Sequence, residues 1–263
     1  MSPQTENPLA TTPPGRLFLV PAPLDFGCDV QAPLQNVMPL GTLEVAASLE
    51  HWVCENAKSA RAYLKRINEV TPLAHTLQTL QIQELPREVH KKGDHTGNFD
   101  AKFLLAAAMQ GHDMGLLSEA GMPAVADPGS SVVRAAHDLG IQVRPLVGPV
   151  SLLLTLAASG LNGQNFAFVG YLPQEAGERV ARIRELESLA LKTGQTQIFI
   201  ETPYRNVAMH QSLLQTLQHN TRLAVCSGLT LDRASCLGDS VKNWKHRSAP
   251  VNNATPAVFA LGR

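Results

Sequence analysis

Residues 116–129 read LLSEAGMPAVADPG, and the rest of the chain is organised around this stretch. An apolar segment, expected to be a strand, passes into small residues and ends at Asp127-Pro128-Gly129, which is typical of a helix start with Asp as the N-cap. Gly and Pro let such a loop turn sharply and let a ligand approach the backbone. Ligands of open α/β sheets bind where a parallel strand ends and its crossover helix begins. The stretch therefore predicts either a ligand-binding loop or an ordinary strand-to-helix connection, which needs the same residues to turn.

The composition is that of a globular protein. The 263 residues are 44% hydrophobic, enough for one large α/β domain or two of ordinary size. Lys plus Arg equals Asp plus Glu at 22 each, so the net charge does not attract the chain to nucleic acid or to an anionic membrane. A local basic patch that binds such a partner remains possible. No apolar run approaches the roughly twenty residues that cross a bilayer. We expect a cytoplasmic protein that does not enter membranes.

Cysteine and histidine are dispersed along the chain. The sequence has nine His and four Cys, with no Cys-x-x-Cys or His-x-x-x-His pair, so we expect no metal site. Free thiols are the default in a reducing compartment. Cys226 and Cys236 could nevertheless face each other across a hairpin.

Strand-like and helix-like segments alternate from Arg16 onward, as in a parallel sheet covered by helices. Residues 1–15, which are polar and rich in Pro and Thr, are expected to form a disordered tail, and residues 16–160 an N-terminal α/β domain with a parallel sheet. Its expected strands are 17–20, 51–54, 77–85, 114–117 and 143–146. We also expect a polar loop at 86–98, a helix at 99–110 capped by Asn98, and an apolar helix at 150–159 that completes the domain.

The second half, residues 165–263, repeats the alternation as a second α/β domain. Its expected strands are 166–170, 196–200, 222–226, 234–237 and 257–261, with a helix at 176–191. The last three strands are closely spaced, which favours a mixed sheet with antiparallel members. The fold class is thus α/β, with two α/β domains and a cleft between them.

An ordered set of motifs carries a family resemblance. They are LVPAPL at 19–24, the stretch 116–129, PLVGP at 145–149, GYLP at 170–173, IFIETPYR at 198–205 and TPAVFALG at 255–262. Each motif alone is weak, but their succession from about residue 16 to the end resembles the tetrapyrrole methylase superfamily. Within it, the motifs are most similar to the branch of ribosomal RNA small-subunit methyltransferase I-like proteins.

The resemblance implies an S-adenosylmethionine-dependent methyltransferase, a homodimer, with the cofactor in the interdomain cleft. Main-chain groups of small residues suit the adenine and methionine parts of this cofactor. The cofactor contacts implied by the matching motifs are Pro23, Leu24, Glu119, Ala120, Gly121, Ala124, Val150, Ser151, Glu201, Leu229, Thr230, Pro256 and Ala257.

A sulfonium methyl group is already electrophilic, so the enzyme mainly has to align the acceptor. If the acceptor is a ribose hydroxyl, a base or a metal must help to remove its proton. Glu55 is the candidate catalytic residue, although it could simply cap the following helix. Asp25, Glu119 and Glu201 are further carboxylates expected at the edge of the cleft.

The chain departs from the resembled branch at one motif in particular. Residues 55–58 read Glu-Asn-Ala-Lys where that branch has Glu-Asp-Thr-Arg, and Lys does not replace Arg in a bidentate phosphate contact. Three functions therefore stay open: 2'-O-ribose methylation of rRNA, methylation of a tetrapyrrole or other small molecule, and binding of S-adenosylmethionine without catalysis.

Overall fold

The computed structural model describes residues 13–92, 94, 99–248 and 250–263. The chain folds into two compact units, each with its own five-stranded sheet. The first unit contains the residues up to Ala22 together with Met38–Gly148, and the second contains Pro23–Val37 and Pro149–Arg263. The α/β class, with one parallel and one mixed sheet, is confirmed. The expected tail falls largely on residues outside the described part of the chain.

The sheet of the first unit is parallel throughout, with the strand order β3-β2-β4-β1-β5. Its strands are β1 (Leu17–Val20), β2 (His51–Cys54), β3 (Gln81–Glu84), β4 (Met114–Leu117) and β5 (Val143–Pro145). The chain passes from β1 across β4 to reach β2, and from β4 across β1 to reach β5. These two connections leave in opposite directions, which makes the carboxyl ends of β1 and β4 the switch point where such sheets bind ligands.

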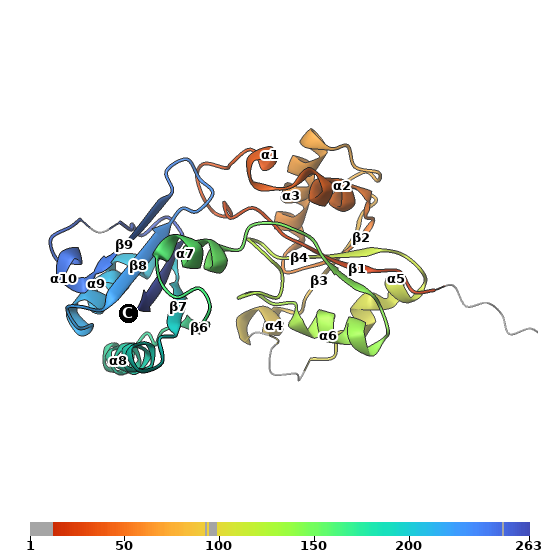
Figure 1. Cartoon of the computed structure of the whole chain (residues 1–263). Coiled ribbons are helices and arrows are strands. Elements are labelled where there is room, and N and C mark those ends of the chain that lie inside the picture. Colours follow the sequence, from red (N-terminus) through yellow and green to blue (C-terminus); the bar gives the residue numbers. More distant parts are fainter. Residues whose placement is uncertain (1–12, 93, 95–98, 249) are drawn as a thin grey trace, which may run out of the picture. The chain divides into compact units, whose positions relative to one another are not determined.

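Helices cover both faces of this sheet, with α2 and α3 on one face and α4 and α6 on the other (Figure 1). The helical segments of the first unit are α2 (Leu40–Ser48), α3 (Ala57–Val70), α4 (Arg87–Lys92), the 3-10 helix η1 (Lys102–Leu105), α5 (Ala106–Met109) and α6 (Ser130–Asp138). Leu17 and Met114 of the central strands pack with Leu104 and Val132 in one apolar core. The three inner strands β2, β4 and β1 are buried along most of their length, which explains their apolar runs, whereas the edge strands β3 and β5 are more exposed and more polar.

Three expectations for this region were wrong in detail. The third strand is limited to Gln81–Glu84, and a short helix, α4, occupies part of the expected loop. The helix expected at 99–110 begins as a 3-10 turn with Ala101 in the cap position and becomes α-helical at Ala106. Its expected cap, Asn98, lies outside the described residues.

The sheet of the second unit is mixed, with the order β6-β7-β10-β8-β9. Only β6 and β7 are parallel; the other neighbours are antiparallel. The strands are β6 (Phe166–Tyr171), β7 (Thr196–Glu201), β8 (Arg222–Ser227), β9 (Ser235–Ser240) and β10 (Ala257–Gly262). Cys226 and Cys236 are direct partners in the β8–β9 register, which is the hairpin alternative left open by the sequence, and both are free thiols.

Alternating side chains of this sheet enter two cores, because successive residues of a strand point to opposite faces. Phe199 and Phe259 stack with ring centroids 5.6 Å apart and belong to the core that contains α8 and α9 residues. Ile198 and Val258 face the other way, against α7. The helical segments of this unit are α1 (Leu34–Val37), α7 (Ser151–Ser159), α8 (Ala176–Thr193), η2 (Pro203–Arg205), α9 (Asn206–Thr216) and α10 (Val241–Trp244).

The position of α7 corrects one expectation. This helix was expected to complete the first domain, but Leu152 and Leu156 pack against Ala224 and Val258 of the second sheet. The apolar pattern predicts a helix but does not specify which sheet its buried side packs against. Within the described residues, no helix is long and apolar enough to span a membrane.

Candidate active site

The loops that follow β1 and β4 lie side by side in the first unit. Ala22 and Gly121 form an antiparallel bridge, with Ala22 N donating to Gly121 O at 2.8 Å and Gly121 N donating to Ala22 O at 3.0 Å. This bridge confirms that the two Pro- and Gly-containing loops meet at the carboxyl edge of the sheet.

The loop after β4, residues 118–129, has an unusual backbone. Ala124 and Ala126 both have φ near 64°, in the left-handed region that residues with a Cβ seldom adopt. The buried Ser118 hydroxyl holds the start of the loop by donating to Gly121 O at 3.2 Å. Strained backbone of this kind persists only where the surrounding structure imposes it, and it is concentrated at ligand sites.

The expected N-cap of α6 was wrong. Gly129, with φ 134°, is the N-cap residue, and Asp127 makes no cap hydrogen bond. Asp94, 4% exposed, caps the helix instead: one of its carboxylate oxygens accepts from the backbone N–H groups of Gly129 and Ser131 at 2.9 and 2.8 Å. A carboxylate at a helix N-terminus satisfies free N–H groups and interacts favourably with the helix dipole. Asp127 is thereby left without a capping role.

Glu55 follows β2 and lies beside this loop. Its Oε1 accepts from the backbone N–H of Glu119 at 3.3 Å, and the Glu119 carboxylate accepts from the Ser59 hydroxyl at 2.9 Å. Glu55 does not cap α3, because Asn56 accepts from the first-turn N–H groups of that helix. The Asn in the divergent motif thus has a structural role, and the Glu55 carboxylate is not used as a cap.

Three carboxyl groups share this edge of the sheet, and two of them have unusual pKa values. Burial, together with the Asp127 carboxylate, raises the pKa of Glu55 to about 7. Burial, together with the Glu119 carboxylate, raises the pKa of Asp127 to about 7 as well. Like charges in a poorly solvated site disfavour the ionised forms. A carboxyl group with a pKa near neutrality can both accept and release a proton at physiological pH.

In the second unit, the predicted residues of three strands gather at one end of the sheet. Ala257, the first residue of β10, is the register partner of Glu201 at the end of β7 and of Ser227 at the end of β8. Gly228 N donates to Pro256 O at 3.0 Å, which joins the loop after β8 to the start of β10. The antiparallel register therefore brings Glu201, Pro256 and Ala257 close to the 228–230 loop.

Thr230 in that loop is strained and incompletely paired. It has φ 71°, and its hydroxyl is buried without a hydrogen-bond partner in the described part of the chain. A buried hydroxyl without a partner is rare in a native protein and indicates a group that a ligand or a water molecule satisfies.

The remaining predicted positions differ in how they are held. Val150 is the N-cap residue of α7 and packs with its apolar core, and Ser151 begins the helix. Glu201 is engaged locally, since its Oε1 accepts from Arg205 at 2.7 Å.

In the segment after β1, Asp25 is 2% exposed and accepts from Ala32 N at 3.0 Å, which supports its interpretation as a turn residue. Pro23 is buried and Leu24 half-buried in the same segment.

Sequence reasoning missed Asp127 and Ser59 as parts of this group. Asp127 was assigned to capping because Asp-Pro-Gly is a strong helix-start signal, and Ser59 stands one turn into α3 with no motif around it. The parallel topology was the available signal, because it places residues after β2 and β4 at the same edge.

A family model described as Tetrapyrrole (Corrin/Porphyrin) Methylases matches residues 38–238. The chain belongs to this family. Tetrapyrrole methylases use S-adenosylmethionine as the methyl donor.

Relatives with the name "Ribosomal RNA small subunit methyltransferase I" are similar in sequence to this tetrapyrrole methylase. The protein of Mesorhizobium japonicum is 30% identical over 86% of the chain, and that of Micromonospora olivasterospora is 36% identical over 77%. The chain spans 67% and 56% of the lengths of these two relatives.

Two crystal structures share the fold of the chain. The methyltransferase CobJ has a TM-score of 0.56 and 15% identity, and the match covers 95% of this chain and 94% of that one. The native form of uroporphyrin III C-methyltransferase from Thermus thermophilus has a TM-score of 0.52 and 15% identity over 95% and 98% of the two chains.

Proposed function

We propose that this protein is a cytoplasmic methyltransferase that transfers the methyl group of S-adenosylmethionine to a ribose 2'-hydroxyl of small-subunit ribosomal RNA. The observation that carries the proposal is the Glu55 carboxyl group, whose pKa is about 7, beside the strained loop after β4. Family membership and the names of the relatives point to the same chemistry.

The residues of the chain fit the proposed cofactor. Ala124 and Thr230 have positive φ values, and the Thr230 hydroxyl is buried without a partner among the described residues. Adenosine and the methionine tail carry donors and acceptors that would satisfy this hydroxyl and the loop backbone. When bound, the cofactor supplies an electrophilic methyl carbon. We assign its binding to Pro23, Leu24, Glu119, Ala120, Gly121, Ala124, Val150, Ser151, Glu201, Leu229, Thr230, Pro256 and Ala257.

We assign removal of the hydroxyl proton to Glu55. Its ionised form accepts the proton, and a base with a pKa near the working pH balances availability against proton affinity. The Glu119 N–H donates to one oxygen of Glu55, which orients the carboxylate. The rest of the acceleration is expected from alignment of the hydroxyl with the methyl carbon.

Calorimetric titration with S-adenosylmethionine and S-adenosylhomocysteine tests the cofactor assignment. The wild-type protein is expected to bind both, and Ala120→Trp, which adds a ring at a half-exposed position of the loop, is expected to abolish binding. A well-folded wild-type protein that binds neither compound would rule out the methyltransferase.

Transfer of labelled methyl groups to isolated small ribosomal subunits tests the acceptor and the base. Glu55→Gln is expected to lower kcat by about 10²–10⁴-fold with unchanged cofactor affinity. Glu50→Gln is the matched control, because Glu50 precedes β2 whereas Glu55 follows it. Labelling of a tetrapyrrole but not of RNA would identify a small-molecule enzyme, and cofactor binding without any transfer would identify a noncatalytic binding protein.

The proposal includes a homodimer, and sedimentation of the purified protein tests it. A monomer at the concentration of the activity assay would overturn this part alone.

A further inference from the structure

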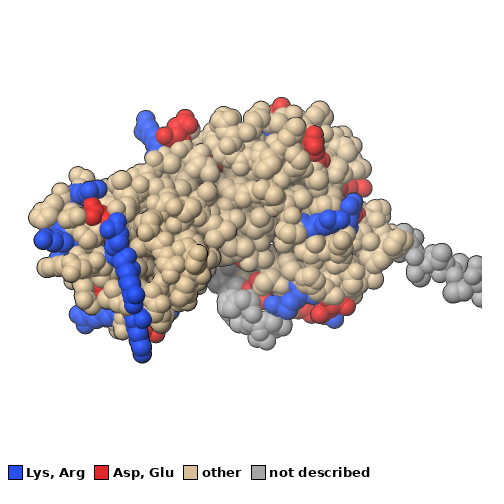
Figure 2. Space-filling view, viewed as in Figure 1, with Lys and Arg blue, Asp and Glu red and all other residues tan. Residues whose placement is uncertain are grey.

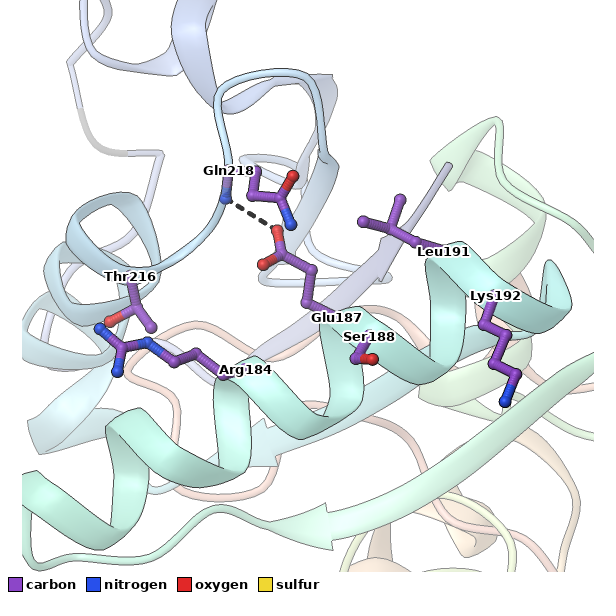
Figure 3. Close-up of a pocket in the computed structure, with 7 residues that line it drawn as sticks. All are labelled: Arg184, Glu187, Ser188, Leu191, Lys192, Thr216 and Gln218. Carbon is purple, nitrogen blue, oxygen red and sulfur yellow. Dashed lines mark hydrogen bonds between the residues drawn. The ribbon is translucent and has the colours of Figure 1, made fainter.

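A second polar site lies on the second unit, between α8 and the segment that joins α9 to β8 (Figure 3). Residues three, four, seven and eight positions apart on a helix share one face, and this spacing aligns the α8 residues of the pocket. The pocket has a volume of about 620 Å³ and is lined by Arg184, Glu187, Ser188, Leu191, Lys192, Thr216 and Gln218.

The floor of the pocket holds a fixed carboxylate. Glu187 is only 4% exposed, and its Oε1 accepts from Gln218 N at 2.8 Å and from the Thr221 hydroxyl. Its other oxygen has no hydrogen-bond partner in the described structure and faces the space between α8 and the Thr216–Gln218 segment (Figure 3). A carboxylate accepts hydrogen bonds and repels anions, so the part of a ligand that reaches the floor must carry a hydroxyl or amino donor.

The rim of the pocket is positively charged. Arg184 and Lys192 are exposed, and neither forms an ion pair with another described residue, whereas Arg182 on the same helix pairs with Glu185 at 2.6 Å. The rim cations are eight residues apart, about 12 Å along the helix axis. Arg263 adds a third cation nearby, because its guanidinium donates to Leu191 O near the end of α8. Lys and Arg side chains are exposed over this unit (Figure 2).

A ligand for this site combines anionic groups at the rim with a donor at the floor. We propose that the pocket binds a ribonucleotide segment of RNA, with phosphates at Arg184 and Lys192 and a ribose 2'-hydroxyl donating to Glu187. The 2'-hydroxyl is the group by which proteins distinguish RNA from DNA, and lysine and arginine supply the salt-dependent attraction to phosphate. The inference rests on the proposed function for its choice of RNA.

The pocket is distinct from the proposed cofactor site. Thr221 precedes β8 and Gly228 follows it, so the two sites lie at opposite ends of one strand, roughly 20 Å apart. An RNA chain of several nucleotides would span this distance. Variants of the pocket are therefore expected to leave cofactor affinity unchanged.

Fluorescence anisotropy with a labelled single-stranded RNA dodecamer of mixed sequence, and with DNA of the same sequence, tests the inference. Arg184→Ala combined with Lys192→Ala is expected to weaken RNA binding by about tenfold near 0.15 M salt. The magnitude of the slope of log K against log salt is expected to decrease by about 1.4, because the double variant loses two phosphate contacts and each single-strand contact contributes about 0.7. Arg182→Ala, which removes a paired cation from the same helix, is the matched control and is expected to retain wild-type affinity.

Glu187→Gln tests the floor separately. The amide keeps an acceptor for Gln218 N and turns its NH₂ group toward the pocket, so the preference for RNA over DNA is expected to fall by about three- to tenfold. Equal strengthening of RNA and DNA binding would overturn the role of Glu187, because it would show only relief of charge repulsion.

Methylation of small subunits, measured on the same proteins, separates the two proposals. The wild type could methylate small subunits normally while the Arg184/Lys192 double variant keeps the wild-type RNA affinity and salt slope. This result would overturn RNA binding by the pocket and would leave the proposed function standing. RNA binding that depends on these residues, without methyl transfer by the wild type, would support the pocket and overturn the function.

Discussion

Gly115 in β4 shows how closely one residue is constrained by its neighbour across the sheet. It is the register partner of Trp52, and a Cβ added at Gly115 would lie 2.5 Å from two ring carbons of this fully buried side chain. We expect Gly115→Ala to lower the free energy of unfolding by about 1–3 kcal/mol, the usual effect of overpacking. Urea unfolding followed by tryptophan fluorescence measures it. Gly41→Ala in α2, where an added Cβ meets no atom, is the control and is expected to be neutral or slightly stabilising.

Asp127 tests the electrostatic environment of the proposed base. Its carboxylate is one of the charges that raise the pKa of Glu55, second to burial. Asp127→Asn is therefore expected to lower the pKa of Glu55 and to shift the rising limb of the pH–rate profile of methyl transfer to lower pH. A profile that keeps its midpoint in this variant would show that the limb belongs to another group.

The sequence could predict that Glu55 and Glu119 lie at one edge of the sheet, but it could not predict how buried they are or which charges lie beside them. Glu55 is the first residue after β2 and Glu119 the second after β4, so a parallel sheet places both at the same edge. The pKa of Glu55 depends on burial and on Asp127, which the sequence pattern assigned to a helix cap. Burial of a polar group depends on long-range packing, which local patterns do not carry.

Among the elements, α6 depends on a cap that is distant in sequence. Asp94 accepts from the N–H groups of Gly129 and Ser131 and from the hydroxyls of Ser130 and Ser131. We expect Asp94→Ala to destabilise the protein by about 2 kcal/mol, since it leaves several donors at the helix start without a partner. Urea unfolding measures the loss. Asp100→Ala, which removes the acceptor of one local hydrogen bond donated by Lys102 N, is the milder control. Equal effects of the two substitutions would contradict a special role for Asp94.

Strands were easier to predict than the partners of helices. The prolines and glycines after β1 and β4 end these strands within the sequence itself, and the strand positions followed. The apolar pattern of α7 predicted a helix correctly but could not show that its Leu152 and Leu156 pack on the second sheet. The same limit explains the cap of α6, because Asp94 lies 35 residues before Gly129.

At the scale of the whole molecule, the two units contain poorly solvated titratable groups of opposite kinds, half-buried carboxyl groups in the first and a buried imidazole in the second. The first unit holds Glu55 and Asp127, whose pKa values are raised to about 7 by burial and neighbouring carboxylates. The second holds His210, 2% exposed and stacked edge-on against Trp244 at 5.4 Å, and burial lowers its pKa. The pH therefore changes the stability of the two units in opposite directions.

The direction of each pH effect on stability depends on how the pKa of the group in the folded protein differs from its pKa in the unfolded chain. Unfolded Glu and Asp titrate near pH 4, so the stabilisation from Glu55 and Asp127 is complete below about pH 4 and is lost as the pH rises through about 7. Unfolded His titrates near pH 6.5, so the stabilisation from neutral His210 is complete above that value and is lost as the pH falls. His51, whose pKa is lowered chiefly by burial, opposes the carboxyl groups within the first unit.

Scanning calorimetry between pH 5 and 8 is expected to resolve two transitions that move in opposite directions. Glu55→Gln combined with Asp127→Asn is expected to stabilise the first unit at pH 8 and to reduce the pH dependence of its transition, while leaving the other transition in place. His210→Leu is expected to flatten the pH dependence of the second transition only, because it removes the one buried imidazole of α9 that would have to be protonated in an apolar core. If either set of substitutions changed both transitions equally, the two units would unfold as one cooperative structure, and the pH response would belong to the whole chain.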